Sequence, residues 1–373
     1  MCNGVQLPVY HEGDKCFVDF YAYDPAREAI RRKKYHLDSV GSKRARRDYA
    51  KRLISELSIK LSQGWRPWAD EKTASRGYVL LDECFKKYLE RISRSSRKKT
   101  IHSYTSRVNI LKEYLSTLSV KPKYACEITR EFIIGYLDWL LSVRKVEART
   151  YNNYRDWMAA FCDYLKDRGY LKENPASDIP KMKKCPKKRK PLTADMLRRL
   201  MKYLETDDRH YLLAVMMEYY TFIRPNELSY VQIQDISVKE QRVFVPGIVS
   251  KNGHDGNVAL NETILRLMID LGVLSEPGNW YLFGKDFRPG PRRYGADTFN
   301  KRWAKIRKVL GFGDEIQFYS LKDAGIRDLA NSAGIVTAKR QARHSDISTT
   351  NKYLEGVDCP LPEEAKHFKG QLS

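Results

Sequence analysis

The segment FYSLKDAGIRDLANSAGIVTAKRQARHSDISTTNKYLE, residues 318–355, does most to decide the fold of the C-terminal part of the chain. Its apolar spacing predicts helices at about 320–333 and 336–343. His344 and Tyr353 follow the second helix, nine residues apart, with hydroxyl side chains between them. An imidazole and a phenol can stabilise phosphate charge and supply a covalent nucleophile without a metal ion.

Residues 191–373 are expected to form one domain around this segment. PLTADMLRRLMKYL predicts an amphipathic helix capped by Thr193, and the residues around 209–220 predict a strongly apolar one. A further helix is expected at about 297–310. QRVFVPGIVSKNGHDGNVAL, residues 241–260, predicts two strands joined at an Asn252-Gly253 turn.

The composition indicates a folded protein with an anionic partner. The 373 residues allow two or three domains, and 42% hydrophobic with 12% aromatic residues favours a packed core. Lys and Arg number 68 against 46 Asp and Glu, a formal charge of +22, with a pI near 9.5. Nucleic acid is the expected partner. An anionic membrane, the ribosome or simply a charged surface are the alternatives.

Other classes of protein lack support in the sequence. The seven cysteines are scattered with no CxxC pair, so neither a zinc site nor a disulfide framework is expected, and a reducing cytoplasm fits. No secretory h-region and no apolar run of membrane-spanning length is present. P-loop, GxSxG and HExxH motifs and a dense carboxylate cluster are also absent, so we expect neither metal nor cofactor.

Residues 1–75 predict a small DNA-binding module. The runs LPVY and CFVDFYAYD alternate as strands do, and a basic stretch from Arg31 to Lys34 follows. A helix is expected at about 42–61, with one apolar face: Tyr49, Leu53, Ile54 and Leu57. The module closes at GWRPW, and the alternative is a solvated charged face.

Residues 78–178 predict a helical bundle that ends near Asn174-Pro175, with helices at 79–94, 99–117, 129–144 and 148–167. The second and fourth helices carry polar residues suited to DNA backbone contacts. These candidates are Lys98, Lys99 and Thr100, the last also as a capping hydroxyl, and Arg149, Asn152 and Arg155. The alternative for each is surface decoration.

Residues 179–190 predict a basic linker. KMKKCPKKRK, residues 181–190, contains seven basic residues and a proline, which cannot pack into a core. In a bipartite DNA clamp, Lys187, Lys188 and Arg189 would lie along the duplex. A nuclear-import signal is the alternative.

The motifs of the last domain resemble those of the tyrosine recombinase (phage integrase) family. YYTFIRPNELSYVQIQDI, residues 219–236, is similar to the family's T-G-x-R-x-x-E-L box, with Arg224 on its arginine and Glu227 on its glutamate. Lys251 falls on the family's β-hairpin lysine. ARHSDISTTNKY is similar to the L-G-H-S box that precedes the nucleophilic tyrosine, with His344 and Tyr353 in place. Other features resemble integrases of Bacteroides-type phages and conjugative elements.

Two departures from the family pattern concern the site. The family's H-x-x-R motif is replaced here by Tyr319-Ser320-Leu321-Lys322. A tyrosine thus stands in place of the histidine, and a lysine stands in place of the family's second arginine. Lysine offers a point charge in place of a planar fork, and Arg327 is a candidate helper. Phe222 also replaces the usual glycine before the arginine.

The resemblance implies a mainly α fold with small β elements (α+β). It comprises an N-terminal arm-binding module, a SAM-like helical core-binding domain and a mixed α/β catalytic domain. It also implies a mechanism in which Tyr353 attacks a DNA phosphate without metal or ATP. Arg224, Lys322 and His344 would hold the phosphate oxygens, Lys251 would protonate the leaving oxygen, and Glu227 and Tyr319 would support them.

The implied partners are double-stranded DNA at attachment or inversion sites, three further protomers in a tetramer on DNA, and DNA-bending accessory proteins, with no membrane. The implied location is the cytoplasm, at the nucleoid, for a bacterial or phage-encoded protein. The alternatives are a type IB topoisomerase-like enzyme, an inactive form of the enzyme and a non-catalytic DNA-binding regulator.

Overall fold

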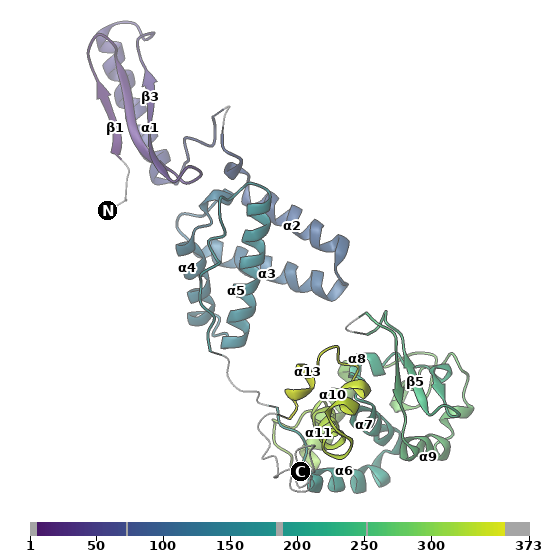
Figure 1. Cartoon of the computed structure of the whole chain (residues 1–373). Coiled ribbons are helices and arrows are strands. Elements are labelled where there is room, and N and C mark those ends of the chain that lie inside the picture. The colour runs from purple at the N-terminus through teal and green to yellow at the C-terminus, as the bar shows by residue number, and fades with distance from the viewer. Residues whose placement is uncertain (1–5, 72–73, 184–188, 251–252, 355–373) are drawn as a thin grey trace, which may run out of the picture. The chain divides into compact units, whose positions relative to one another are not determined.

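The computed structural model describes residues 6–71, 74–183, 189–250 and 253–354 (Figure 1). The chain divides into two compact units, Met1–Cys185 and Pro186–Ser373. Helices dominate both units, and each also holds one three-stranded antiparallel sheet. The predicted α+β fold class, mainly helical with small sheets, is confirmed.

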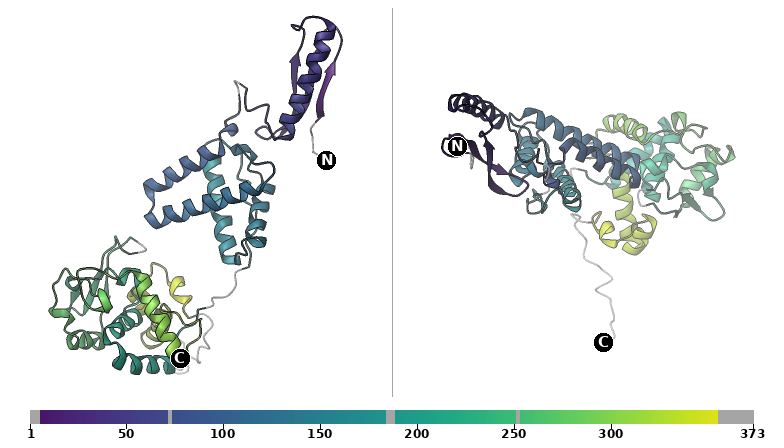
Figure 2. Two further views of the ribbon diagram at one scale, coloured as in Figure 1. Left: turned by 180° about the vertical axis from the view of Figure 1, so that it is seen from behind. Right: turned by 90° about the horizontal axis from the view of Figure 1, so that it is seen from above.

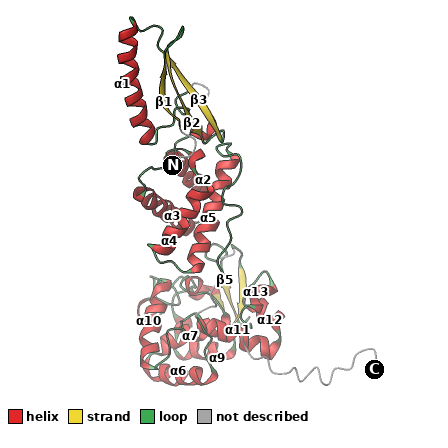
Figure 3. Cartoon of the chain, turned by 90° about the vertical axis from the view of Figure 1, so that its left-hand side faces the viewer, coloured by secondary structure: helices red, strands yellow, loops and turns green. Residues whose placement is uncertain are grey.

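The first unit begins with a three-stranded sheet in the order β1-β2-β3. The strands are β1 Gln6–His11, β2 Phe17–Asp24 and β3 Ala29–His36, and α1 Lys43–Ser62 packs against β1 and β2 (Figure 3). Alternate residues of β2, namely Val18, Phe20 and Ala22, are buried, as a half-buried strand requires. β1 and β2 confirm the strands predicted from LPVY and CFVDFYAYD.

Strand β3 was not predicted, because its middle is the basic stretch Arg31–Lys34. The cations are balanced within the module: Arg31 pairs with Asp24 at 2.7 Å, and Lys33 pairs with Glu71 at 2.8 Å. The guanidinium of Arg31 also lies 4.1 Å from the centre of the Trp68 ring. Charged side chains hide the alternation that identifies a strand, so the sequence indicated only a basic surface.

Helix α1 confirms the predicted helix, with the Ser42 side chain accepting from the Ala45 amide at 3.3 Å. The predicted apolar face is partly wrong. Leu57 and Ala50 are buried, whereas Tyr49 is 41% exposed. The buried face is therefore rotated toward Ala50, since a small residue fits closest to the sheet.

Four long helices complete the first unit and confirm the predicted bundle to within about two residues at each end. They are α2 Leu81–Ser95, α3 Lys98–Thr117, α4 Arg130–Ser142 and α5 Ala148–Asp167, with 3₁₀ turns η1 Arg76–Tyr78 and η2 Ala125–Glu127. Their core contains Trp157, Phe161 and Leu111, all essentially buried.

The second unit, coloured teal to yellow in Figure 2, is built around helices α6 to α13. Its longer helices are α6 Ala194–Asp207, α7 Arg209–Thr221, α9 Glu262–Asp270, α10 Ala296–Val309 and α11 Ser320–Ala333. Shorter helices are α8 Pro225–Leu228, α12 Ile335–Gln341 and α13 Ile347–Asn351. The 3₁₀ turns are η3 Ile233–Asp235, η4 Val273–Ser275 and η5 Lys285–Phe287.

The sheet of the second unit has the order β4-β5-β6 and comprises β4 Ile236–Ser237, β5 Arg242–Val245 and β6 Gly256–Ala259. The pairing of Val243 with Val258 confirms the predicted hairpin. The strands separate after the Val245–Gly256 pair, so the predicted Asn252-Gly253 turn does not join them directly. Asn252 lies outside the described residues.

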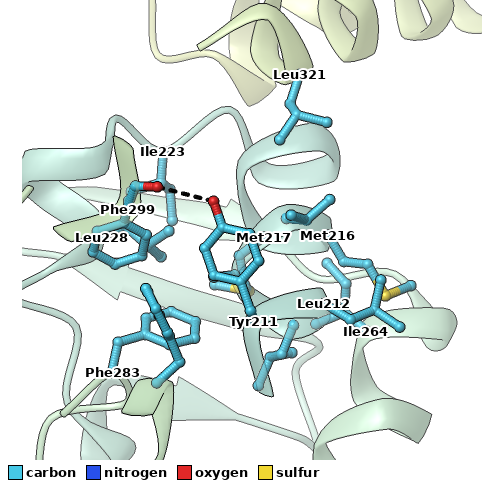
Figure 4. Close-up of a cluster of buried hydrophobic side chains, with 14 of the residues drawn as sticks. Tyr211, Leu212, Met216, Met217, Ile223, Leu228, Ile264, Phe283, Phe299 and Leu321 are labelled. Carbon is cyan, nitrogen blue, oxygen red and sulfur yellow. Dashed lines mark hydrogen bonds between the residues drawn. The ribbon is translucent and has the colours of Figure 1, made fainter. Parts of the chain in front are cut away.

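Helix α7 forms the centre of the second unit. Nine of its 13 residues are buried, including the run Tyr211–Glu218, as its apolar sequence predicts. Tyr211 donates its hydroxyl hydrogen to the Phe299 carbonyl at 2.9 Å, which satisfies a buried polar group (Figure 4). Thr193 caps α6 through the Met196 amide at 3.3 Å, which confirms that prediction.

Helix α11 crosses the end of α7 with no side chain between the two backbones. A β-carbon added at Gly325 would lie 1.9 Å from the Tyr219 carbonyl oxygen and 2.7 Å from Cε1 of Phe222. Only glycine allows this approach. The crossing fixes the residues at the end of α7 against those at the start of α11, where the candidate site lies.

Candidate active site

The turn after α7 presents Arg224. Phe222 follows Thr221 as the C-cap, in the left-handed conformation with φ of 56°, and is only 2% exposed. This conformation turns the chain so that Arg224 caps α8. A phenylalanine with positive φ is sterically disfavoured, and burial of its ring in the cluster with Ile326 and Ala342 stabilises it there.

Glu227 holds two arginines. Its carboxylate is 1% exposed and accepts from Nη1 of Arg224 at 2.9 Å through one oxygen, and from Nη2 of Arg343 through the other. A buried carboxylate without cations would be strongly unfavourable, so the three groups stabilise one another. Arg224 remains 21% exposed and is oriented by this contact.

Lys322 lies beneath the site on α11 and is fully buried. Its ammonium group donates to the Phe222 carbonyl at 2.6 Å. Burial, followed by the charge of Arg224, lowers the pKa of Lys322 to about 7. At neutral pH the amine is therefore only partly protonated.

A second buried ionisable group, Glu218 on α7, lies near Lys322. Burial raises the pKa of its carboxyl well above the ordinary range, although the charge of Lys322 opposes this. Its two oxygens have no hydrogen-bond partner in the part of the chain that the structure describes. Burial therefore favours the neutral, protonated form of Glu218 over its carboxylate.

His344 and Tyr353 are neighbours. Their rings stack with centroids 5.7 Å apart and an angle of 19°. Nδ1 of His344 lies 3.0 Å from the buried hydroxyl of Thr350. Burial, then the charges of Lys322 and Arg224, lowers the pKa of His344 to about 4, so the imidazole is neutral at pH 7. Its Nε2 is buried without a partner among the described residues.

Tyr319 and Tyr353 form a phenol pair. The pKa of Tyr319 is raised by burial, by the neighbouring charge of Tyr353 and by a hydrogen bond between the two side chains. Tyr353 follows α13 directly, and its amide donates to the Thr350 carbonyl at 3.0 Å. α13 thus contains Thr350, which contacts His344, and the candidate nucleophile lies just beyond its C-cap, Lys352.

Arg189 lies at this site. The sequence predicted that it would lie along DNA as part of a linker. Instead its guanidinium binds both oxygens of Asp323, at 2.5 and 3.0 Å, and lies 4.4 Å from the centre of the Tyr319 ring. Asp323 is 6% exposed and recruits this cation, because a buried carboxylate requires a partner.

The start of α3 remains exposed. Lys98, Lys99 and Thr100 all face solvent, and so does Arg149 at the start of α5. The helix is capped by Arg97, so Thr100 belongs to the first turn and the predicted capping hydroxyl is wrong. The two lysines stay available for a polyanion.

Asn152 and Arg155 have partners inside the fold. The amide of Asn152 pairs with both backbone groups of Met182 at 2.9 Å, and the side chain is buried. Arg155 donates to the carbonyls of Ile179 and Ser177, each at 2.8 Å. Both hold the segment that leaves the bundle, so they are poor candidates for the predicted DNA contacts.

Three candidate residues, Lys187, Lys188 and Lys251, lie outside the described residues. Arg327 lies within them, but its guanidinium donates to the Leu192 carbonyl at 3.2 Å and to Asp328 at 3.1 Å. These contacts give Arg327 a structural role in place of the predicted help at the site.

Arg343 is a site residue that the sequence analysis missed. It binds Glu227 and has φ of 54°, a conformation that favours glycine. The signal was present, because Arg343 stands where the L-G-H-S pattern has its glycine. Among the described residues, no group of three or more His, Cys, Asp or Glu side chains is arranged to hold a metal ion.

Two family models match the chain. The phage integrase SAM-like domain matches residues 80–184, and the phage integrase family model matches residues 190–358, so together they span most of the chain. The chain belongs to the phage integrase family. The resemblance inferred from the Arg224 and His344–Tyr353 motifs is thereby confirmed.

Solved integrase structures share the fold of this family member. A lambda integrase dimer bound to a COC′ core site covers 95% of this chain and 97% of its own, with 16% identity and a TM-score of 0.64. The Tn1549 transposon integrase with circular intermediate DNA covers 78% of this chain and 98% of its own, with 12% identity and a TM-score of 0.60.

A curated relative, the putative defective protein IntQ of Escherichia coli strain K12, is 23% identical over 216 residues. The match covers 55% of this chain and spans half the length of that relative. In the described residues of this integrase, no helix is both long and apolar enough to cross a membrane.

Proposed function

We propose that this integrase is a site-specific recombinase that cuts and rejoins double-stranded DNA through a 3′-phosphotyrosyl intermediate on Tyr353, without metal or ATP. The observation that carries the proposal is the cluster in which Tyr353 stacks on His344 and pairs with Tyr319. Arg224, oriented by Glu227, belongs to the same charged environment.

In the proposed cleavage, the Tyr353 oxygen bonds to the scissile phosphorus as the bond from phosphorus to the 5′-oxygen breaks. A phenol has an ordinary pKa of about 10, so its proton must leave during attack. The phosphodiester energy is kept in the new ester. Attack by a 5′-hydroxyl of the partner duplex reverses the chemistry and releases Tyr353.

Each proposed role follows from the chemistry of the side chain. Arg224 and the protonated form of Lys322 stabilise the charge on the phosphate oxygens. Neutral His344 can donate or accept one hydrogen bond through Nε2. Lys251 is the proposed acid for the leaving 5′-oxygen, and Glu227 and Tyr319 position their neighbours.

The proposed substrates are attachment or inversion sites, bound by residues 1–75, the bundle of residues 78–178, the linker 179–190 and the catalytic domain 191–373. Lambda integrase has been solved as a tetramer bound to a Holliday junction. Exchange between two duplexes needs four cuts, so we propose a tetramer here as well, aided by DNA-bending proteins. We place it at the bacterial nucleoid.

Covalent trapping tests this function. The full chain is incubated in EDTA with nicked duplexes from DNA flanking its own gene, and adducts that survive SDS are sought. We expect an adduct that Tyr353→Phe abolishes, with DNA affinity retained. The matched control Tyr23→Phe, an exposed phenol of the N-terminal sheet, should leave the adduct unchanged.

Other outcomes identify the alternatives. Specific DNA binding with no adduct would overturn the proposal in favour of a regulator or an inactive enzyme. An adduct that persists in Tyr353→Phe would assign the nucleophile elsewhere. Relaxation of supercoiled DNA without joining of two duplexes would indicate a topoisomerase-like enzyme.

A further inference from the structure

We propose that Arg343 is a second phosphate-binding arginine of this site. It would lie beside Arg224 and neutralise charge on the non-bridging oxygens of the scissile phosphate. The inference rests on the proposed function. It follows from four observations: a strained backbone, a space kept free by a glycine, a shared carboxylate and a buried lysine that is already engaged.

The backbone at Arg343 is held in a conformation that a side chain disfavours. Its φ of 54° lies in the left-handed region, between α12 and His344. The amide of Arg343 donates to the Arg340 carbonyl at 3.0 Å, and that of His344 to the Lys339 carbonyl at 3.1 Å. Such strain in a non-glycine residue is typical of functional sites.

Gly256 leaves room for the arginine side chain. A β-carbon at this first residue of β6 would lie 2.6 Å from Cδ and 3.5 Å from Nη1 of Arg343. The side chain therefore passes directly over the strand backbone and reaches Glu227. Position 343 therefore holds an arginine in a turn that favours glycine, and position 256 holds a glycine that leaves room for the arginine side chain.

The carboxylate of Glu227 binds two guanidinium groups, one on each oxygen. One negative charge against two positive charges leaves a net positive charge in a place where only 21% of Arg224 and 15% of Arg343 is exposed. Nη1 of Arg343 is buried and has no hydrogen-bond partner among the described residues. A phosphate oxygen would supply both the acceptor and the missing negative charge.

The properties of the buried Lys322 explain why a second guanidinium would help to bind the phosphate oxygens. Lys322 is directed at the Phe222 carbonyl and is only partly protonated at neutral pH. Phosphoryl transfer spreads charge over several phosphate oxygens, which a single arginine does not cover. Arg343 exchanges no proton: the Tyr353–phosphorus bond forms, the bond to the 5′-oxygen breaks, and a separate acid protonates that oxygen.

The test measures single-turnover adduct formation by the full chain on a nicked duplex. Arg343→Gly removes the guanidinium and relieves the backbone strain, which offsets part of the stability lost when one oxygen of Glu227 loses its partner. We expect adduct formation to slow by about 100-fold, with DNA affinity within about threefold and the protein still folded at the assay temperature. Arg343→Lys keeps the charge, and we expect a smaller loss of about tenfold.

A neutral substrate separates charge neutralisation from structural support. Methylphosphonate at the scissile position removes the charge of one non-bridging oxygen. On this DNA we expect Arg343→Gly to react within about threefold of the unsubstituted protein. An equal loss on phosphate and methylphosphonate DNA would overturn the proposal, because a structural defect does not depend on substrate charge.

Two substitutions of glycine by alanine test the inference without changing Arg343 itself. Gly256→Ala should displace its side chain and slow adduct formation at least tenfold, whereas Gly295→Ala, where a β-carbon meets no atom within 4 Å, should not. If Arg343→Gly fails to fold, Arg343→Lys and the two alanine variants test the inference in its place. Unchanged rates of adduct formation in both Arg343→Lys and Gly256→Ala would overturn it. Absence of any adduct from the unsubstituted protein would overturn the proposed function and the inference with it.

Discussion

The two units differ in what they bury. Among the described residues, the first unit buries three polar side chains, Asp19, Asp24 and Asn152, and all have partners in the chain. The second unit buries ten, most of them around the site. Its unsatisfied buried atoms include the oxygens of Glu218, Nη1 of Arg343 and Nε2 of His344.

The two units therefore differ in the kind of buried group that has no partner among the described residues. In the first unit these groups are the hydroxyls of Tyr10 and Tyr136 and the indole nitrogens of two tryptophans, whereas in the second unit they belong to carboxyl, guanidinium and imidazole groups. Buried ionisable groups without partners are unfavourable and rare in folded proteins. Their concentration at one place indicates that the fold accepts a local loss of stability for the sake of a substrate. Substitutions should therefore affect stability in the first unit and chemistry in the second.

Among the substitutions that compare the two units, the largest expected effect is on chemistry, from Lys322→Met. We expect adduct formation to slow by about 100-fold or more, because the lost ammonium carries charge beneath the phosphate site. If Lys322→Met forms the adduct as fast as the unsubstituted protein, the proposed difference between the two units is wrong.

The same variant has a signature in stability. Burial lowers the pKa of Lys322 from the ordinary 10.5 to about 7, so between these pH values the unfolded chain holds a proton that the folded chain lacks. The free energy of unfolding therefore rises with pH across this window, by at most about 1.4 kcal/mol per pH unit. Chemical denaturation at pH 7 to 9 should show a shallower rise for Lys322→Met, and equal slopes would contradict the shifted pKa.

In the first unit, Asn152→Leu should act on stability alone. The leucine leaves both backbone groups of Met182 without partners, which costs about 2–4 kcal/mol in the free energy of unfolding. Chemical denaturation measures this loss, and Arg149→Gln, an exposed position on the same helix, should change it by less than about 0.5 kcal/mol. Adduct formation from the bound complex should be unchanged for both.

Arg189 lies over the Tyr319 ring in the candidate site, although the sequence places it at the end of a linker. We expect Arg189→Gln to slow adduct formation by about tenfold and to move the alkaline rise of the rate to higher pH. The reason is that its charge, 4.4 Å from the centre of the Tyr319 ring, stabilises the anionic form of that phenol.

Arg199 provides the matched control for Arg189. It also lies over an aromatic ring, 5.3 Å from the centre of Phe312, and its guanidinium donates to the Leu310 carbonyl. Arg199→Gln should leave the pH profile unchanged. A shift of equal size in both variants would assign Arg189 a structural role.

The smallest expected effect is that of Lys99→Gln at the exposed start of α3. DNA affinity should fall only modestly, and the slope of log affinity against log salt should decrease by about 1 if one phosphate contact is lost. Lys121→Gln, another exposed lysine of the bundle region, should leave the slope unchanged. Salt-dependent binding measurements check both, and thermal stability should not change for either.

The sequence predicted what depends on local periodicity. Helix α3 was identified because its apolar residues repeat every three or four positions, and helix α7 because its sequence is strongly apolar. Strand β3 was missed because its charges mask the alternation, and the connection from β5 to β6 because strand ends depend on pairing.

At the site, motif spacing identified Arg224, Lys322, His344 and Tyr353, and the structure brings them into one region. The same spacing could not predict which charges pair over long separations. Arg189 binds Asp323 across 134 positions, and Arg343 binds Glu227 across 116. Asn152 and Arg155 were assigned to DNA for the same reason, because their partners follow only from the path of the chain after α5.

The close crossing at Gly325 limits how this member of the phage integrase family can be redesigned. Because α11 rests directly on the α7 backbone there, every substitution at this position forces the two helices apart and displaces Lys322 from Phe222. In laboratory evolution toward new target sites, a library that randomises position 325 would consist almost entirely of inactive variants. Diversity is better placed at exposed positions such as Lys98 and Arg149, where the chain tolerates change without moving its reaction centre.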